Sequence, residues 1–293
     1  MSRVLGIDIG GTFTRYGIVE NKFVIHVKKV YTKDILDFPN FVKDVFDKYQ
    51  NIDSISIGIP GVVYKNKIIS VPNVKLLEIR NLDDEIYKLT KTKCIINRDV
   101  YLLFSNDINR LNLSNEKNVL GFYLGTGLGN AIKMNGNIIK GEHGYAAELG
   151  HIPIIGNTRK CSCGKIGCAE TMISGKALTE IYDSEKLSCE FNQLFVKYSL
   201  HPKIIEFIDN FIMVIAIEIN ILDITTIIIG GGVTNMLNFP KKYIEEGLLK
   251  QLRTDNIRKQ LKIYFVDDSP ISSILGASLI INEGETNEYS NRL

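Results

Sequence analysis

Short apolar runs alternate with longer amphipathic stretches along the whole chain. In the first half, β-branched apolar runs predict strands near 3–9, 15–20, 23–30, 54–59 and 93–97. Helical spacing of apolar residues predicts helices near 38–49, 81–91 and 99–110. In the second half, the same criteria predict strands near 119–124, 129–134, 226–230 and 262–266, and helices near 174–182, 202–222, 240–253 and 270–283. This alternation of strands and helices is typical of α/β layers.

Two parts of this pattern occur twice. The run VLGIDIGGT at Val4–Thr12 resembles VLGFYLGTG at Val119–Gly127, with an offset of 115 residues. The run ISIGIPG at Ile55–Gly61 resembles IIIGGG at Ile227–Gly232, with an offset of 172 residues. The two offsets differ by 57 residues, which predicts an insertion between the repeated units of the second half. The polar segment Ser114–Asn118 is the expected boundary between the halves.

Composition narrows the class of protein. The chain has 293 residues, 45% apolar and 23% charged, which indicates about two globular domains. Its net charge of +2 is too balanced to indicate nucleic acid or an anionic membrane surface as a partner. The N-terminus has no signal-peptide pattern, and the apolar stretch 211–221 is too short and too polar to span a bilayer. We therefore expect a cytoplasmic protein whose five cysteines stay reduced.

Glycine-rich turns follow three of the predicted strands. The first, DIGGT, precedes another strand rather than a helix, which disfavours a Rossmann or Walker motif. Glycines allow backbone N–H groups to approach phosphates closely, and an aspartate beside them is a suitable ligand for hydrated Mg²⁺. One such turn by itself is more typical of an ordinary β-turn, but three on repeated strand ends favour a bound nucleotide. The candidate nucleotide-binding residues are Asp8, Gly10, Gly11, Thr12, Gly125, Thr126, Gly127, Gly231 and Gly232.

These motifs together resemble the sugar kinase, Hsp70 and actin superfamily. Within it, GEHGYAAELGH at Gly141–His151 and CSCGKIGCAE at Cys161–Glu170 resemble the ROK family of repressors and sugar kinases. The similarity extends over about 4–277. It implies a duplicated, actin-like and ribonuclease H-like α/β fold, with a ligand cleft between two domains. It also implies ATP and Mg²⁺ as cofactors, and a homodimer.

The resemblance also suggests domain limits. We expect a smaller N-terminal α/β domain over 1–117, completed by a C-terminal helix near 275–287. A larger C-terminal α/β domain would cover 118–274 and carry the insertion.

The segment NRDVY carries the candidate general base. In ROK kinases, an Asn-Asp pair at a strand end faces the sugar and the Asp accepts the hydroxyl proton, which implies that role for Asp99. Without the resemblance, Asp99 is equally well a helix N-cap. The usual Asn is replaced by Arg98, which only donates hydrogen bonds.

This Arg-Asp pair resembles the bacterial D-allose kinase branch of the family. It implies that Arg98 and Asp99 contact the sugar and that D-allose is phosphorylated at its 6-hydroxyl by ATP. Glucokinase and N-acetylmannosamine kinase are the alternatives within the family.

Four residues in the predicted insertion form a candidate metal site. The spacing of His151, Cys161, Cys163 and Cys168 does not match a zinc finger, so a redox cluster or incidental buried thiols are alternatives. A C-x-C pair in a reducing compartment favours metal, and the ROK resemblance implies a closed structural Zn²⁺ site. The expected tight turn depends on Gly164 and Gly167.

The carboxylates that bracket this insertion are candidate sugar ligands. By resemblance, Glu148, His151 and Glu170 face the sugar, with His151 binding zinc through one nitrogen and presenting the other to the substrate. Each glutamate alone is more typical of a solvated surface, but the position of the two at both ends of the metal-binding segment favours a binding role. Asn73 resembles a sugar-side loop residue of the family.

A sugar-responsive transcriptional repressor is the second function within the family. ROK repressors carry a helix-turn-helix domain ahead of the DxGGT strand, whereas this chain has three residues there and no basic patch. We therefore expect a kinase.

Overall fold

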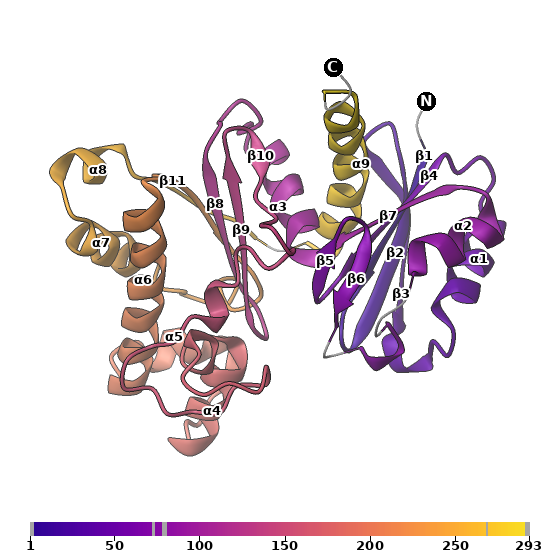
Figure 1. Ribbon diagram of the computed structural model, residues 1–293. Helices are drawn as coiled ribbons and strands as arrows, with labels where there is room; N and C mark the ends of the chain where they lie inside the picture. Colours follow the sequence, from indigo (N-terminus) through magenta and orange to yellow (C-terminus); the bar gives the residue numbers. More distant parts are fainter. Residues whose placement is uncertain (1–2, 72–73, 78–80, 268, 291–293) are drawn as a thin grey trace. The chain divides into compact units, whose positions relative to one another are not determined.

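The computed structural model describes residues 3–71, 74–77, 81–267 and 269–290. The chain forms two compact units (Figure 1). The first comprises Met1–Ser114, Lys140–Ala146 and Ser269–Leu293, and the second Asn115–Ile139 and Ala147–Asp268. The expected limits were 1–117 and 118–274, whereas here the first unit ends at Ser114 and also includes Lys140–Ala146 and the chain from Ser269 onward. Asn73 lies outside the described residues.

The first unit is built on a five-stranded mixed sheet with the order β3-β2-β1-β4-β7. The first three strands are antiparallel neighbours, and β4 and β7 join parallel to β1. Their bounds are β1 (Arg3–Ile9), β2 (Phe13–Glu20), β3 (Phe23–Tyr31), β4 (Ser54–Ile59) and β7 (Lys93–Arg98). All five strands agree with the predicted ones to within two residues. Burial explains the agreement for β4, because each of its positions is buried.

Helices cover both faces of this first sheet. The helices α1 (Phe38–Lys48) and α2 (Leu82–Thr90) lie on one face, and α9 (Ser272–Ser290) lies on the other (Figure 1). The helix α3 (Asp99–Arg110) packs against α9. Close packing depends on glycine here, since a Cβ on Gly276 of α9 would collide with the Leu102 carbonyl oxygen of α3.

The second unit repeats the sheet. Its strands have the order β10-β9-β8-β11-β12, again with two antiparallel pairs followed by two parallel ones. Their bounds are β8 (Val119–Leu124), β9 (Leu128–Met134), β10 (Asn137–Ile138), β11 (Thr226–Gly230) and β12 (Lys262–Phe265).

The register of the two sheets confirms the internal repeat. In the first sheet Ile7 lies opposite Ile57, and in the second Phe122 lies opposite Ile229. The offsets of 115 and 172 residues carry one pair onto the other. The two offsets seen in the sequence therefore relate the β1–β4 pairing of the first sheet to the β8–β11 pairing of the second.

A long helix with one buried face organises the core of the second unit. The helix α6 (Pro202–Leu222) begins with proline, whose missing N–H costs nothing at a helix start, and matches the predicted range 202–222. Its Phe207 and Phe211 are fully buried. The other helices of this unit are α4 (Gly175–Ser184), α5 (Leu194–Lys197), α7 (Lys241–Gln251) and α8 (Asp255–Gln260). Among the described residues, no helix is both long and apolar enough to cross a membrane.

Several short elements were not predicted. A hairpin of β5 (Val62–Tyr64) and β6 (Lys67–Ser70) turns through Lys65 and Asn66, which both have positive φ. The short strand β10 follows a turn at Asn135 and Gly136, with φ of 53° and 86°. An Asn-Gly pair is a strong hairpin signal and marks this second turn in the sequence, whereas Lys-Asn gives a weak one. The 3₁₀ turns are η1 (Thr32–Asp34), η2 (Lys75–Leu77), η3 (Leu149–His151), η4 (Ala169–Thr171) and η5 (Phe191–Gln193).

Candidate functional site

Asp99 is the first residue of α3, directly after the end of β7. Its Oδ1 accepts a hydrogen bond from the Val100 N–H at 2.7 Å, which is not the bond that a helix N-cap makes. The surrounding protein atoms, followed by the negative charge of Asp8, raise the pKa of Asp99 to about 7. A carboxylate with this pKa is suited to accept a proton near neutral pH.

Arg98 precedes Asp99 and is buried, with only 9% of its surface exposed. Its Nη1 donates to the Ala146 carbonyl oxygen at 2.8 Å, and its guanidinium carbon lies 5.4 Å from the centre of the Tyr101 ring. Arg98 was expected to contact a sugar hydroxyl, but here its Nη1 donates to the protein backbone. The positive charge of Arg98 also lowers the pKa of Asp99, against the larger effect of burial.

Asp8 lies on β1 near Asp99, since its charge contributes to the raised pKa of Asp99. Its Oδ2 accepts a hydrogen bond from the Ser273 hydroxyl at 2.8 Å and lies 3.8 Å from Arg15 Nη1. Ser273 was not predicted, because 265 residues separate it from Asp8 and no local motif marks it. The carboxylates of Asp8, near the end of β1, and Asp99, after the end of β7, provide oxygen ligands of the kind that Mg²⁺ prefers, although β4 separates the two strands in the sheet.

The first glycine turn joins β1 to β2. The Gly10 N–H donates to the Phe13 carbonyl at 2.9 Å, and the Thr32 hydroxyl donates to the Gly10 carbonyl at 2.7 Å. A side chain at Gly10 would place its Cβ 2.9 Å from the Phe13 oxygen, so the tight turn requires glycine. Gly11 and Thr12 are exposed at its tip.

The second glycine turn joins β8 to β9 and is held by α4. The Gly175 N–H donates to the Gly125 carbonyl at 2.7 Å, and the Lys176 N–H donates to the Thr126 carbonyl at 3.2 Å. The carboxylate of Glu170 packs against Gly127, and its Oε2 accepts a hydrogen bond from the Leu128 N–H at 3.0 Å. This turn and a predicted sugar ligand are therefore brought together within the second unit.

The third glycine motif lies against the second. Gly231 has a φ of 105°, and a Cβ there would lie 2.6 Å from the backbone of Leu124, the residue before Gly125. The Val233 N–H donates to the Leu124 carbonyl at 3.0 Å. A Cβ on Gly232 would meet open space, so this glycine leaves its backbone accessible.

The four predicted metal ligands converge. Their donor atoms all lie within 4.8 Å of one another. His151 Nδ1 lies 3.6 Å from Cys161 Sγ, and Cys163 Sγ lies 3.6 Å from Cys168 Sγ. Zn–S bonds of about 2.3 Å in a tetrahedron give ligand separations of about 3.7 Å, so the donor set fits Zn²⁺.

Backbone geometry explains how the ligands come so close. Gly164 and Gly167 have φ of 90° and 85°, as expected for the tight turn, and a Cβ on Gly167 would lie 2.7 Å from the Asn157 oxygen. Burial, followed by the neighbouring thiols, raises the pKa of Cys168 to about 12. A divalent cation would offset this effect, because it binds the thiolate form.

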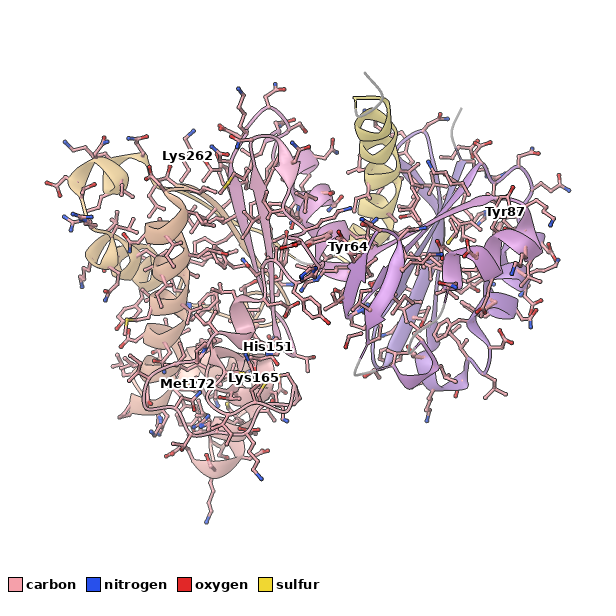
Figure 2. All side chains as sticks on the ribbon, in the orientation of Figure 1. Tyr64, Tyr87, His151, Lys165, Met172 and Lys262 are labelled. Atoms are coloured by element: carbon pink, nitrogen blue, oxygen red, sulfur yellow. The ribbon has the colours of Figure 1, made fainter. Side chains whose placement is uncertain are left out.

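The two ring nitrogens of His151 have different partners. Nδ1 faces the cysteines, whereas Nε2 lies 3.7 Å from Glu148 Oε2. A carboxylate behind a metal-binding imidazole fixes its orientation. Lys165 also donates to the His151 carbonyl at 3.0 Å, and both residues are labelled in Figure 2. The nitrogen that the sequence assigned to the sugar thus faces Glu148, which is itself a predicted sugar ligand.

A pocket of about 500 Å³ lies in the second unit between the metal-binding segment and α4. Thr126 of the second glycine turn, Cys161 and Glu170 line it, together with Lys176 on α4. The structure thus gathers the predicted residues in two groups. The first unit holds Asp8, Arg98, Asp99 and the first turn, and the second holds the remaining glycines, Glu148, Glu170 and the metal ligands.

A family model covers almost the whole chain. The model of the ROK family matches residues 4–283. An N-acetyl-D-glucosamine kinase of Mannheimia succiniciproducens is 28% identical over 84% of this chain and 88% of its own. An N-acetylmannosamine kinase of Vibrio cholerae is 26% identical over 95% of this chain and 97% of its own.

The fold is shared with a solved structure. A ROK glucokinase from Streptomyces griseus, crystallised with glucose and AMPPNP, superposes with a TM-score of 0.77. It has 20% identity and covers 94% of this chain and 98% of its own. The predicted actin-like, two-domain α/β fold is confirmed, while none of these proteins supports the predicted likeness to D-allose kinases. The chain belongs to the ROK family.

Proposed function

We propose that this chain is an ATP-dependent sugar kinase that phosphorylates the 6-hydroxyl of a hexose or an N-acetylhexosamine. The observation that carries the proposal is the carboxylate of Asp99, held at the head of α3 with a pKa of about 7 and with Asp8 as a neighbour. Kinases of the family use a carboxylate at this motif position, and curated relatives are sugar kinases.

Asp99 acts as the general base. It accepts the proton of the sugar hydroxyl while that oxygen bonds to the γ-phosphorus of ATP and the bond to the ADP oxygen breaks. A pKa near 7 leaves much of Asp99 ionised at neutral pH and still basic enough to take the proton. The products are ADP and the sugar 6-phosphate.

The glycine turns bind the nucleotide. The N–H groups of Gly10 and Gly125 close their own turns, so the backbone at Gly11, Thr12, Thr126 and Gly127 approaches the phosphates. Gly231 and Gly232 also contact the nucleotide. Asp8 is the residue that would hold Mg²⁺, which supplies charge neutralisation for the transferred phosphoryl group.

The sugar site uses the ends of the metal-binding segment. Glu148, His151 and Glu170 accept or donate hydrogen bonds to sugar hydroxyls, and a structural Zn²⁺ on His151 and the three cysteines keeps this segment in shape. The position of Glu170 supports this proposal, because its carboxylate is held by a hydrogen bond from the Leu128 N–H.

The identity of the sugar is a finer proposal. The Arg98–Asp99 pair favours D-allose through its resemblance to the D-allose kinase branch, which implies a contact of Arg98 with the sugar. The bond from Arg98 to the Ala146 carbonyl weakens that argument, and the relatives are named for N-acetylglucosamine and N-acetylmannosamine. D-Allose, glucose and both N-acetylhexosamines are therefore competing substrates.

One coupled assay tests the function and the substrate together. ADP release from Mg-ATP is measured with zinc-loaded protein and each of the four sugars, ranked by kcat/KM. We expect ADP release with at least one sugar. No release with any aldohexose or N-acetylhexosamine would exclude the kinase, and a better rate with glucose or an N-acetylhexosamine would exclude D-allose as the preferred substrate.

We also propose a cytoplasmic homodimer, as family membership suggests. Light scattering of the purified protein at micromolar concentration measures its mass. A monomer at this concentration would exclude a stable dimer.

A further inference from the structure

The loop Lys140–Ala146 lies between two segments of the second unit but packs with the first. It closes on itself, because the Ala146 N–H donates to the Lys140 carbonyl at 3.2 Å. A loop of this length that belongs structurally to the other unit needs specific attachments, since loop backbone alone provides little burial. We call it the 140–146 loop.

Two contacts attach the 140–146 loop to the first unit. Arg98 Nη1 donates to the Ala146 carbonyl at 2.8 Å. Gly144 has a φ of 83° and lies so close to β5 that a Cβ would be 2.7 Å from the Val63 carbonyl oxygen. Both contacts require a particular residue: a buried arginine in one case and a glycine in the other.

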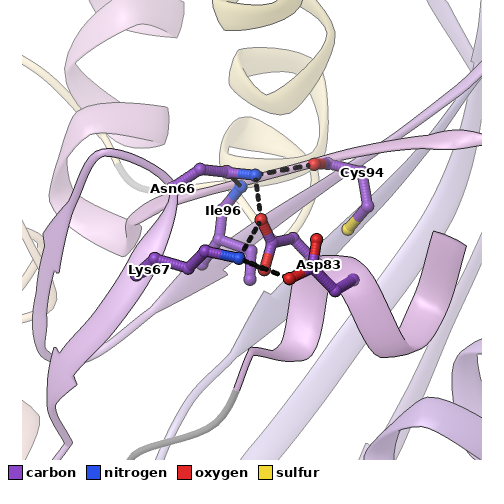
Figure 3. A network of polar contacts seen from close by, with 6 residues as sticks. Asn66, Lys67, Asp83, Cys94 and Ile96 are labelled. Carbon is purple, nitrogen blue, oxygen red and sulfur yellow. Dashed lines mark hydrogen bonds and ion pairs between the residues drawn. The ribbon is translucent and has the colours of Figure 1, made fainter.

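The surface that receives Gly144 is itself rigid. The β5–β6 hairpin is tied to β7 through Asn66, whose Nδ2 donates to the Cys94 carbonyl at 3.0 Å and whose Oδ1 accepts from the Ile96 N–H at 2.6 Å (Figure 3). Asn66 Nδ2 also donates to Asp83 at 2.8 Å, and Lys67 donates to the same carboxylate at 3.0 Å. The hairpin therefore keeps its place next to the strand that ends in Arg98 and Asp99.

The chain continues from the 140–146 loop directly into the predicted sugar ligands. Ala147 follows with a φ of 62°, a conformation that alanine rarely adopts, and Glu148 comes next. Ala146, which the Arg98 contact holds, is therefore only two residues before Glu148 in the chain.

We infer that Arg98 is a positioning residue: it binds the 140–146 loop rather than the sugar, and so fixes the entry of the chain into the Glu148–His151 segment. This inference rests on the proposed function, because it assigns Glu148 and His151 to the sugar site. The role of Arg98 is then not to bind a sugar hydroxyl itself but to orient Glu148 and His151, which bind the sugar.

Gly144 provides the test that separates the two roles. In Gly144→Ala the new Cβ meets the Val63 carbonyl, so the 140–146 loop is displaced while Arg98 and every predicted sugar ligand stay intact. The matched control is Gly136→Ala, because Gly136 has a φ of 86° but a Cβ there meets nothing within 4 Å. Gly136 lies in the β9–β10 turn, outside the proposed site.

Steady-state kinetics with the best sugar give the first readout. We expect Arg98→Ala and Gly144→Ala to raise KM for the sugar by a similar factor, on the order of 10-fold or more, with KM for ATP unchanged. The double variant should be little worse than either single one, because both remove the same attachment. Gly136→Ala should match the wild type.

A direct sugar contact by Arg98 predicts a different result. Arg98→Ala would then change the ranking of the four sugars, while Gly144→Ala would leave both KM and ranking unchanged. That outcome, or fully additive effects in the double variant, would overturn the inference.

Hydrogen exchange of the sugar-free, zinc-loaded protein gives a readout that does not depend on catalysis. We expect faster exchange in 140–146 in both Arg98→Ala and Gly144→Ala, with the strands of the first sheet unchanged. Unchanged exchange in Arg98→Ala would overturn the attachment even if the kinase is active. Faster exchange with no kinase activity in the wild type would instead exclude the proposed function and leave the attachment intact.

Discussion

The two units share one sheet topology but carry different chemical groups at equivalent strand ends. The offset of 115 residues places Asp8 of the first unit on Tyr123 of the second, and Gly10 on Gly125. The first unit has acids at its strand ends, with Asp99 near Asp8. The second has none at the position of Asp8 and instead carries the metal-binding insertion and Glu170. Both units therefore have the glycine turn, whereas the candidate base, Asp99, belongs to the first unit.

The two glycine turns also differ in how they are supported. Each turn has a backbone hydrogen bond of its own, from the Gly10 N–H to the Phe13 carbonyl in the first and from the Gly125 N–H to the Gly127 carbonyl in the second. The first turn is also held by the Thr32 hydroxyl, and the second by the first residues of α4. The repeated motif therefore has different outside supports in the two units.

The largest effect is expected at the base. Asp99→Asn should lower kcat by about 10²- to 10⁴-fold while sugar binding persists, because the amide cannot accept the hydroxyl proton. In the wild type, kcat/KM should rise as pH increases through about 7, because only the ionised carboxylate acts as base. Turnover assays from pH 5.5 to 9, with calorimetry for sugar binding, measure both.

Glu218 of the second unit provides the matched control for Asp99. Burial raises its pKa to about 7 as well, but its partner is Asn130 in the core. Glu218→Gln should therefore keep the wild-type kcat. An equal loss of activity in both variants would mean that the raised pKa of Asp99 is no sign of a catalytic role.

The next largest effect tests the insertion that only the second unit has. Cys168→Ser removes a fully buried metal ligand, so the zinc content should fall below about one per chain. The melting temperature should drop by about 5 °C or more, because loss of a structural metal ranks among the most destabilising changes. Elemental analysis and calorimetry measure these, with Cys189→Ser, outside the cluster, as control. Full zinc content in Cys168→Ser would exclude this ligand set.

The sequence predicted the sheets well because their strands carry unambiguous local signals. The range predicted for α6 was correct, since Pro202 marks its start and apolar residues fill it to the end. The hairpin β5–β6 was missed because Lys65 and Asn66 adopt positive φ without a glycine. The grouping of Lys140–Ala146 with the first unit was also missed, because it depends on the side chain of Arg98, far away in the sequence.

The four metal ligands were predicted from the C-x-C pair together with the ROK resemblance, and the fold brings their donor atoms together. The bond from Ser273 to Asp8 and the pairing of His151 Nε2 with Glu148 depend on tertiary structure, which no local pattern encodes. Arg98 is the clearest example of a contact that the sequence did not predict. It was expected to contact the sugar, whereas in the structure its side chain is buried and donates a hydrogen bond to a backbone carbonyl.

A smaller effect is expected from Glu218, in the core of the second unit. The folded-state pKa of Glu218 is raised from 4.5 to about 7, so its contribution to stability is present below about pH 4.5 and is lost as pH rises through about 7. Glu218→Gln removes this dependence, so its free energy of unfolding relative to wild type should increase with pH, by at most about 3 kcal/mol. Urea unfolding at pH 5 and pH 8 measures the difference. A difference that is the same at both pH values would show that Glu218 is ionised throughout.

The smallest effect compares equivalent glycines of the two turns. Gly10→Ala places a Cβ 2.9 Å from the Phe13 oxygen, whereas the same change at Gly125 meets nothing within 4 Å. We expect Gly10→Ala to lower the free energy of unfolding by about 1–2 kcal/mol and Gly125→Ala to lower it by less than about 0.5 kcal/mol. Chemical denaturation of both variants measures this, independently of any effect on nucleotide binding. Equal losses would mean that the space around the added Cβ does not set the tolerance of the two turns.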